Sequence, residues 1–235
     1  MRRGISLGLV AGAGLLSLSG CIPAGPTRTE SKEIEIGSAE SVRTVVRMSA
    51  GSLNVSGGAK KLAEANFHYS SRVWRPHVRY DETGSRGRLT IEETGRSGFQ
   101  TGNVENDWTV RLNDEVPMDL EVKLGAGDSR LDLAGMSLRN LEVDMGAGQL
   151  NLDLRGNWNR DFDVRIRGGV GEATVRLPVR VGVIVEARGG LGGISARGLK
   201  RRGDSYVNDA YRESKTTLRV DIKGGIGQIN LIAES

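Results

Sequence analysis

The sequence is poor in the residues from which catalytic and metal sites are usually built. Its 235 residues include one cysteine, two histidines and only 4% aromatic residues. A single cysteine excludes an intramolecular disulfide and any cysteine-cluster metal site. The histidines, His68 and His77, show no spacing typical of a zinc site, and no Gly-x-Ser-x-Gly segment marks a serine nucleophile. We therefore expect no catalytic residue, no metal and no cofactor.

The chain also lacks a large excess of charge of one sign. The formal net charge is +4, and when Arg2 and Arg3 are set aside, 31 of the 33 basic residues remain against 29 acidic ones. This balance gives no reason to expect a nucleic acid as a partner. Residues 118–155 carry a net charge of −3 and residues 156–203 a net charge of +6. Stacked repeats would form a dipole able to orient on anionic lipid or polymer, although a solvated surface explains the same pattern.

The first 21 residues have the layout of a bacterial lipoprotein signal. Two arginines precede the apolar residues 5–18, a segment shorter than the ~20 residues that span a membrane. The segment ends in a run that resembles a lipobox, Leu18-Ser19-Gly20-Cys21. We expect residues 1–20 to be removed and Cys21 to be acylated, with residues 21–33 as a flexible tether. The protein would then be held to a bacterial membrane, outside the cytoplasm; an ordinary secretory signal with a chance cysteine is the alternative.

A short glycine-containing motif, such as Leu124-Gly125-Ala126-Gly127, is repeated through the rest of the chain. Apolar and polar residues alternate on both sides of it, but the phase slips by one residue at each copy, as from Val122 to Leu131. Because strand side chains alternate between faces, the slip would expose the apolar set unless the backbone absorbs a residue there. Glycine does this by adopting a positive φ. We predict strand corners at Gly51, Gly127, Gly148, Gly171, Gly192 and Gly227, and we assign Ala147, Val170, Leu191 and Ile226 beside them to the core.

The spacing of these corners predicts an all-β fold, a short β-solenoid over residues 34–235. The intervals from Gly127 to Gly227 are 21, 23, 21 and 35 residues, within the range of stacked repeats. Residues 118–235 are expected to form the repeat coils, and residues 58–117 a strand and hairpin insertion that caps the first coil. We expect a loop or short helix at 198–216, and residues 218–232 as the last strand pair of the stack.

One stretch carries groups suited to binding a sugar or a phosphate. It interleaves basic and aromatic residues on an expected edge strand, and its members are Arg72, Trp74, Arg75, Arg79 and Tyr80. Arginine and aromatic rings can stack on sugars or pair with phosphate. Pro76 and the charges can equally serve only to protect an edge strand from aggregation.

Two further patterns are similar to known binding or catalytic sites. The Gly-Gly-x-Gly corners are similar to calcium-binding nonapeptides, but the position of the aspartate ligand holds Ala173, Ile194 and Ile229. Those corners are therefore expected to face the core. The carboxylate pairs Asp119/Glu121 and Glu142/Asp144 could be imagined as a glycosidase acid and base. An alternation of apolar and charged residues demands the same carboxylates for solubility alone.

Three segments together resemble a known family. They are the run from Asp107-Trp108 to Val116-Pro117-Met118, then Leu124-Gly125-Ala126-Gly127, and Gly146-Ala147-Gly148. They resemble the toast-rack family of bacterial envelope proteins, which is related to the C-terminal domain of LiaF-type envelope-stress regulators and to adhesin-like β-solenoid domains. The resemblance covers residues 34–235 in layout and is sharpest over 106–155.

The function expected from these features is non-enzymatic. The protein would be a lipid-anchored envelope protein that offers a rigid β surface to an envelope protein or an anionic envelope polymer. The resemblance implies a second possibility, an accessory sensor or regulator of an envelope-stress pathway. An enzyme acting on envelope polysaccharide is the third.

Overall fold

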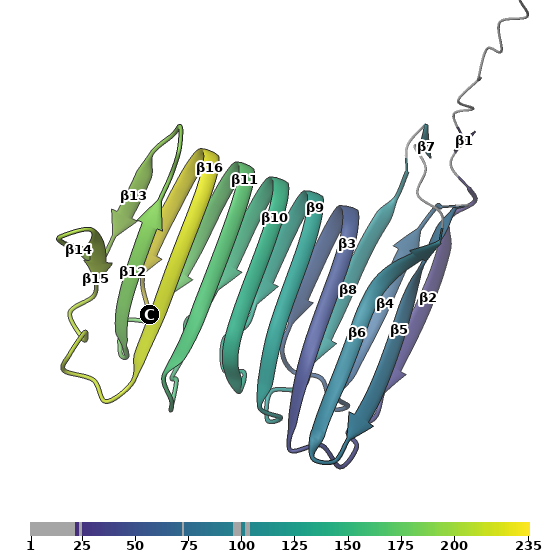
Figure 1. The fold of residues 1–235 in the computed structure, drawn as a ribbon, viewed down its shortest axis with the longest axis horizontal. Coiled ribbons are helices and arrows are strands. Elements are labelled where there is room, and N and C mark those ends of the chain that lie inside the picture. Colours follow the sequence, from purple (N-terminus) through teal and green to yellow (C-terminus); the bar gives the residue numbers. More distant parts are fainter. Residues whose placement is uncertain (1–21, 24, 72, 96–99, 102–103) are drawn as a thin grey trace, which may run out of the picture.

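The structure is a computed structural model that describes residues 22–23, 25–71, 73–95, 100–101 and 104–235. In this part of the chain every regular element is a strand (Figure 1). The strands are β1 (Ile22–Pro23), β2 (Arg28–Ile34), β3 (Ser41–Ser56), β4 (Ala63–Tyr69), β5 (Trp74–Thr83), β6 (Arg86–Gly95), β7 (Gln100–Thr101), β8 (Asn106–Leu112), β9 (Met118–Asp132), β10 (Leu138–Asp153), β11 (Phe162–Leu177), β12 (Gly182–Arg188), β13 (Ile194–Arg197), β14 (Lys200–Arg202), β15 (Ser205–Val207) and β16 (Thr217–Ala233).

The molecule is built on one sheet that folds over along a line of glycines. The long strands β3, β9, β10, β11 and β16 each run through a corner and turn back (Figure 1). They pair in parallel, so that each corner glycine lies opposite the next; Gly127, for example, lies between Gly51 and Gly148. Each strand therefore contributes a first arm before its glycine and a second arm after it. We call the line formed by Gly51, Gly127, Gly148, Gly171, Gly227 and Gly192 the glycine ridge.

The corners reconcile the alternating pattern with a single core between the two arms. All six ridge glycines have a positive φ, between +123° and +142°. In β10, Val143 and Met145 are buried before the corner and Leu150 and Leu152 after it. Because the backbone absorbs one residue at the corner, both arms turn their apolar side chains inward. The all-β solenoid expected from the sequence is confirmed.

The order of the coils in space differs from their order in the chain. Strand β16 pairs with β11 along one edge and with β12 and β13 along the other. The expectation that residues 218–232 form the last strand pair of the stack is therefore wrong. An inner place gives the long β16 hydrogen-bond partners on both edges. The outer edges are left to the short strands β13 on the second arm and β14 on the first, and short edge strands are less prone to aggregate.

The insertion that permits this crossover contains a hairpin. Residues 198–216, expected as a loop or a short helix, form β14 and β15, followed by turns. Strand β15 pairs antiparallel with β12 and with β14. The hairpin therefore extends the first-arm side of the sheet beyond β12, and the chain then returns to place β16.

The N-terminal part of the chain extends both arms beyond the first coil. Strand β6 pairs with the first arm of β3, and β5 pairs with β6. On the second arm the order is β3, β8, β4 and β2. The expected tether to residue 33 is too long, because β2 begins at Arg28 and forms a seven-residue ladder with β4.

Candidate binding surfaces

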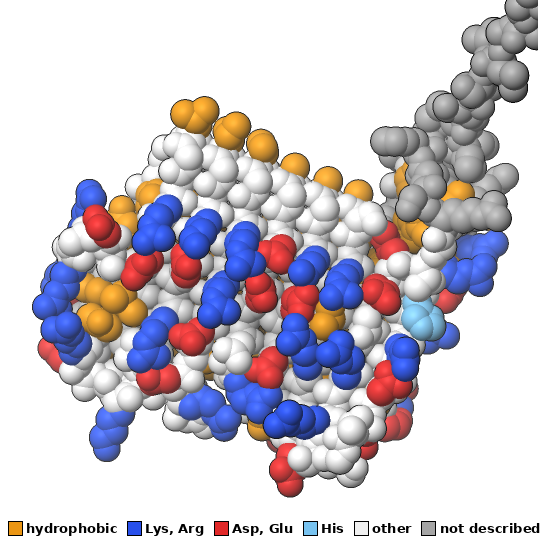
Figure 2. Space-filling view, viewed as in Figure 1, with side chains coloured by type: hydrophobic (Ala, Val, Ile, Leu, Met, Phe, Trp, Pro, Cys, Tyr) orange, Lys and Arg blue, Asp and Glu red, His pale blue; other side chains and the backbone are white. Residues whose placement is uncertain are grey.

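The outer face of the first arms is covered with charged side chains (Figure 2). In parallel strands in register, residues at equivalent positions form rows across the sheet. Arg167 illustrates the pairing, since its Nη1 lies 2.6 Å from Glu142 and 3.3 Å from Asp144. The row nearest the ridge is mostly basic and consists of Arg47, Lys123, Asp144, Arg167, Lys223 and Arg188.

Glu121 is the most enclosed charge on this face. Its residue is 7% exposed, and its carboxylate lies 2.6 Å from Arg43, 3.4 Å from Arg47 and 3.1 Å from Lys123. Burial by itself would raise the pKa of Glu121, but the hydrogen bonds and charges of Arg43 and Lys123 outweigh it and hold the pKa below its ordinary value. Glu121 therefore ties three cations of neighbouring strands into one cluster.

A hollow of about 550 Å³ lies at the end of the same face that is remote from the ridge. Arg139 pairs with Asp119 and Arg43 with Glu121, whereas within the described part of the chain no carboxylate forms an ion pair with Arg86 or Arg88. Planar guanidinium groups bind phosphate and carboxylate through two parallel hydrogen bonds. We call this the arginine hollow; it is lined by Ser41, Arg43, Asp81, Thr83, Arg86, Gly87, Arg88, Asp119 and Arg139.

The tip of the ridge presents a row of apolar side chains to solvent. Figure 2 shows this row along the edge where the strands bend. Val170 is 55% exposed, Ile226 53% and Leu191 72%. Our assignment of these residues and Ala147 to the core is wrong, because the residue before each corner glycine lies on the outside of the bend. In spatial order the row is Ala50, Ala126, Ala147, Val170, Ile226 and Leu191.

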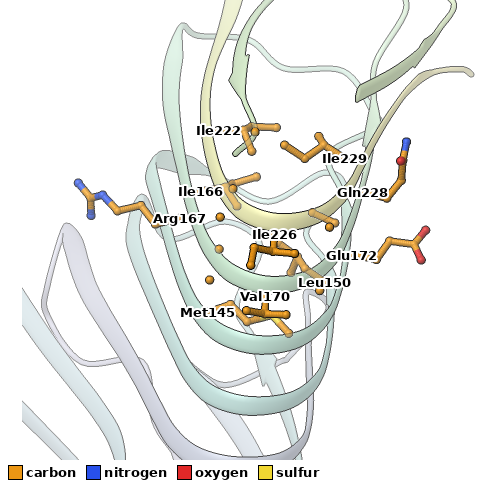
Figure 3. A pocket seen from close by; sticks show the side chains of 18 of the residues that line it. Met145, Leu150, Ile166, Arg167, Val170, Glu172, Ile222, Ile226, Gln228 and Ile229 are labelled. Atoms are coloured by element: carbon orange, nitrogen blue, oxygen red, sulfur yellow. The ribbon is translucent and has the colours of Figure 1, made fainter. Parts of the chain in front are cut away.

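Inside the bends, the large apolar side chains are in the first three coils and the small residues are in the other three. The residue three before the corner glycine is Met48, Leu124 or Met145 in the first three coils, and each of these is buried. In the other three coils it is Gly168, Gly224 or Gly189. A Cβ on Gly168 would meet no atom within 4 Å, and a narrow hollow of about 40 Å³ remains beneath these bends (Figure 3). Its apolar lining includes Met145, Leu150, Ile166, Ile222 and Ile229.

This glycine-cornered architecture agrees with the comparison to known families. Residues 23–176 match the N-terminal domain of toast_rack, DUF2154. The chain belongs to the toast-rack family. No curated protein matches it at a significant level.

Solved structures include one with the same fold at substantial sequence identity. The crystal structure of a "putative cell adhesion protein" from Clostridium sporogenes is 34% identical, with a TM-score of 0.82, over 88% of this chain and 100% of that one. A "putative adhesin" from Bacteroides fragilis is 9% identical over 91% of this chain and 100% of that one, with a TM-score of 0.33. The second likeness is too remote to support an argument.

Several residues predicted for the toast-rack protein's attachment and binding lie outside the described residues. They are Arg72 and the lipobox residues Leu18, Ser19, Gly20 and Cys21. Acylation of Cys21 remains a prediction. In the described part of the chain, no helix is long and apolar enough to cross a membrane.

Strand β5 separates the aromatic groups of the predicted binding stretch from its basic groups. Trp74 and Tyr80 pack against the core, and Arg75 and Arg79 are exposed. The hydroxyl of Tyr80 donates to Glu82 at 2.7 Å. Burial, reinforced by this carboxylate, raises the pKa of Tyr80 to about 12. The structure therefore does not bring the rings and guanidinium groups onto one face, and β5 is an edge strand that contains Pro76.

The residues considered for catalysis do not converge. His68 lies on β4 in the second-arm layer and His77 on β5 in the first-arm layer. Asp119, Glu121 and Glu142 each pair with a cation, and the pKa of Glu121 is lowered, whereas a general acid needs a raised one. No group of three or more residues able to hold a metal ion occurs among the described residues.

Sequence reasoning missed the arginine hollow and the apolar row at the tip of the ridge. The hollow is made by strands β3, β5, β6, β9 and β10, whose pairing is not evident from their sequences. The apolar row did leave a signal, because the corners change from Gly-Ala-Gly to Gly-Gly-x-Gly with a large apolar residue at x.

Proposed function

We propose that this toast-rack protein is a non-enzymatic, lipid-anchored protein of the cell envelope with an adhesin-like or scaffold role. The likeness to the "putative cell adhesion protein" of Clostridium sporogenes, at 34% identity and a TM-score of 0.82, is the observation that carries the proposal. A surface of fixed shape suits such a role. The folded sheet supplies one, because its side chains are fixed in register by strand pairing and a continuous core.

The arginine hollow is the surface that best fits an anionic envelope polymer. Arg86 and Arg88 are exposed there, beside Arg43 and Arg139, whose acidic partners lie on the neighbouring β9. Phosphate or carboxylate groups repeated along a polymer would meet several guanidinium groups at once. Individual contacts at such an exposed site are weak, so binding should depend on this multiplicity and on low salt.

Retention on isolated cell wall tests the binding surface. The full-length protein, extracted from membranes, would be compared with Arg86→Ala/Arg88→Ala and with Arg75→Ala/Arg79→Ala. Both double variants remove two exposed arginines, but only the first removes arginines that line the arginine hollow; the second leaves those in place and frees the carboxylate of Asp81, the partner of Arg79, at the edge of the hollow. We expect the first to lose most of its retention and the second to keep it. Equal retention of all three proteins would exclude the arginine hollow, and loss in the second alone would favour β5.

Metabolic labelling tests the anchor separately. Growth with a labelled fatty acid should mark the wild-type protein and not Cys21→Ala, which should be released or accumulate as a precursor. A mutant that is still labelled would contradict acylation at Cys21.

Membership of the toast-rack family supports a second candidate function, an accessory sensor or regulator of an envelope-stress pathway. A regulator should cross-link to one specific membrane protein in intact cells. Its deletion should also change transcription during treatment with cell-wall antibiotics, whereas loss of a purely adhesive protein should leave that response unchanged.

A further inference from the structure

The last three bends of the ridge differ from the first three in where their large apolar side chain lies. It is inside the bend in the first three and outside the bend in the last three. Where the first three coils bury Met48, Leu124 and Met145, the others have glycine and a hollow. Where the first three expose alanine at the tip, the others expose Val170, Ile226 and Leu191. Packing of the core does not explain this difference, because it leaves space inside and apolar surface outside.

We propose that Val170, Ile226 and Leu191 dock on the anionic lipid surface of the membrane that carries the protein. The inference rests on the lipid anchor of the proposed function, because that anchor brings the ridge to a bilayer. Single exposed apolar residues are common on proteins. These three lie on adjacent coils, so their positions follow one another at about 4.8 Å along a single edge. A continuous apolar edge of this kind can enter the boundary between lipid headgroups and acyl chains.

Basic residues flank the apolar tips on the first-arm side. Arg167, Lys223 and Arg188 lie three residues before Val170, Ile226 and Leu191 and are neighbours in register. All three are exposed, and their carboxylate partners lie on the same row or farther from the ridge. Long basic side chains beside apolar tips are suited to contact lipid phosphates.

The second-arm side of these bends carries less charge. Glu172 follows the corner of β11, and Asn230 donates a hydrogen bond to it at 2.6 Å. The equivalent position on β16 is Gln228. In Figure 3, Arg167 lies on one side of the bends, and Glu172 and Gln228 lie on the other. Three cations therefore face one anion across this part of the ridge, which favours an anionic surface.

The N-terminal segment reaches the domain at the level of the ridge. The amide of Gly25 donates to the carbonyl oxygen of Ser70 at 2.6 Å. Next to Ser70, Tyr69 lies opposite Asn106, whose side chain donates to the Ala50 carbonyl oxygen at the first corner, also at 2.6 Å. Figure 1 shows β1 and β7 beyond this same edge of the sheet. Position 21 is four residues before Gly25, a separation that an extended chain spans with up to about 13 Å.

An anchor at position 21 and the apolar tips would hold the protein at two points. From β2 to β13 the second-arm sheet crosses eight strand spacings, or roughly 38 Å. The lipid would hold one end of the ridge and the apolar tips the other, so that the ridge lies along the membrane. Arg43 in the arginine hollow lies eight residues before the corner glycine Gly51. At about 3.3 Å per strand residue, the arginine hollow would then stand about 25 Å from the bilayer and face the envelope.

A second copy of the chain is the other possible occupant of this edge. A contact between two ridges would bring Arg167, Lys223 and Arg188 of both copies close to one another. Lipid phosphates would instead give these cations anionic partners beside the apolar tips, in addition to their carboxylate partners in the same row or farther from the ridge. Charge complementarity therefore favours the membrane.

A fluorescent probe at the tip tests the proposal in the full-length protein. Acylation would block the thiol of Cys21, so a cysteine introduced by Leu191→Cys would be the only free thiol. Val179→Cys is the matched control, because Val179 is also exposed but lies in the loop at the other end of the arms. Each protein is labelled with an environment-sensitive dye and reconstituted in vesicles of phosphatidylcholine and phosphatidylglycerol that contain a lipid with a quencher on its acyl chain.

The expected result is a blue-shifted and at least twofold quenched probe at position 191, and an unquenched probe at 179. Arg167→Gln/Lys223→Gln/Arg188→Gln should reduce the quenching at 191. Flotation with the vesicles without quenching at 191 overturns the docking and leaves the anchor standing. If the protein does not float with the vesicles, both the docking and the lipid anchor are overturned. A blue shift without lipid quenching, accompanied by cross-links between two copies, would overturn the docking on lipid and show that a second copy of the chain covers the apolar tips.

Discussion

A Cβ atom on Gly148 would lie 1.8 Å from the carbonyl oxygen of Gly127. The same relationship continues along the ridge, with Gly127 against Gly51 at 1.9 Å and Gly171 against Gly148 at 1.8 Å. Each of these glycines also has a positive φ. A corner therefore requires glycine for two separate reasons, the backbone conformation of its own strand and the close approach of the neighbouring strand.

Gly148→Ala should separate these two requirements when compared with Gly156→Ala. Gly156 has a φ of +121°, close to the +128° of Gly148, but the nearest atom to an added Cβ lies 3.3 Å away, so its replacement should cost about 1–3 kcal/mol, mostly for the backbone conformation. Gly148→Ala should lower the free energy of unfolding by more than about 3 kcal/mol, because overlap with the Gly127 backbone adds to the conformational cost. Urea denaturation measures both. Equal losses would show that crowding along the ridge does not matter.

Trp108 should be the most sensitive residue of the N-terminal cap. It is fully buried and its ring meets Phe67 edge to face, with centroids 5.0 Å apart. Trp108→Ala should lower the free energy of unfolding by about 3–5 kcal/mol. Trp108→Phe should cost roughly 1–2 kcal/mol, because it keeps an aromatic ring and removes an indole N–H that has no partner among the described residues. Thermal unfolding followed by circular dichroism would show whether the two variants differ as expected.

Asn208 fastens the insertion to the loop before β12. Its side chain donates to the carbonyl oxygens of Pro178 and Val181 at 3.1 and 2.7 Å and accepts from the amide of Val183 at 2.9 Å. Asn208→Ala should lower the free energy of unfolding by roughly 2–3 kcal/mol, because three buried backbone groups lose their partner. Asn151→Ala, on a half-buried site of β10, should change stability by less than about 0.5 kcal/mol. A loss at Asn208 no larger than at Asn151 would contradict this role.

Glu121 should make stability depend on pH. Since its pKa is lowered in the folded state, its stabilising effect is present above its unfolded value of about 4.3 and is lost as the pH falls through the folded value. At pH 7, Glu121→Gln should lower the free energy of unfolding by about 1–2 kcal/mol, a modest amount because the three cations are partly exposed. Urea titrations at pH 7 and pH 3 should show this difference shrinking in acid.

Glu142→Gln is the control for that measurement. Its carboxylate is more exposed and pairs with Arg167, so the substitution should cost less than about 0.5 kcal/mol at pH 7. A difference for Glu121→Gln that persists undiminished at pH 3 would mean that the ionised carboxylate is not what stabilises the cluster.

Deletion of residues 217–235 should damage more than the last segment of the chain. Strand β16 lies between β11 and the β12–β13 coil. Its removal takes away one of the two parallel partners of β11 and the parallel partner of β12 and β13. We expect residues 178–216 to lose protection from hydrogen exchange as well, while β3, β9 and β10 keep theirs. In a stack that followed chain order, the same deletion would leave 178–216 protected, and that result would refute the crossover.

The local features of the coils could be predicted because they depend on near neighbours in the sequence. The phase slip at Gly148 requires an extra residue at the corner whatever surrounds it, and the alternation of Leu150 and Leu152 fixes which face is buried. The same rule failed at Val170, Leu191 and Ile226. Alternation continues up to these residues, but the bend itself removes them from the interior.

The order of the strands could not be predicted because it depends on contacts between distant segments. Strands β12 and β16 have similar apolar patterns on their first arms, and nothing local states which of them pairs with β11. The arginine hollow has the same origin, since Arg88 and Arg139 lie far apart in the chain and meet only through the pairing of β6, β3, β9 and β10.

The sequence alone determined that the chain is all-β, where it bends, and which faces of its strands are apolar, because strand periodicity and glycine conformation act over a few residues. Only the tertiary structure decided that β16 enters between β11 and β12, that scattered arginines share one hollow, and that the outermost apolar residues line one edge. These features arise when separate coils are set side by side, and the register between neighbouring strands, rather than any single strand, determines which side chains meet.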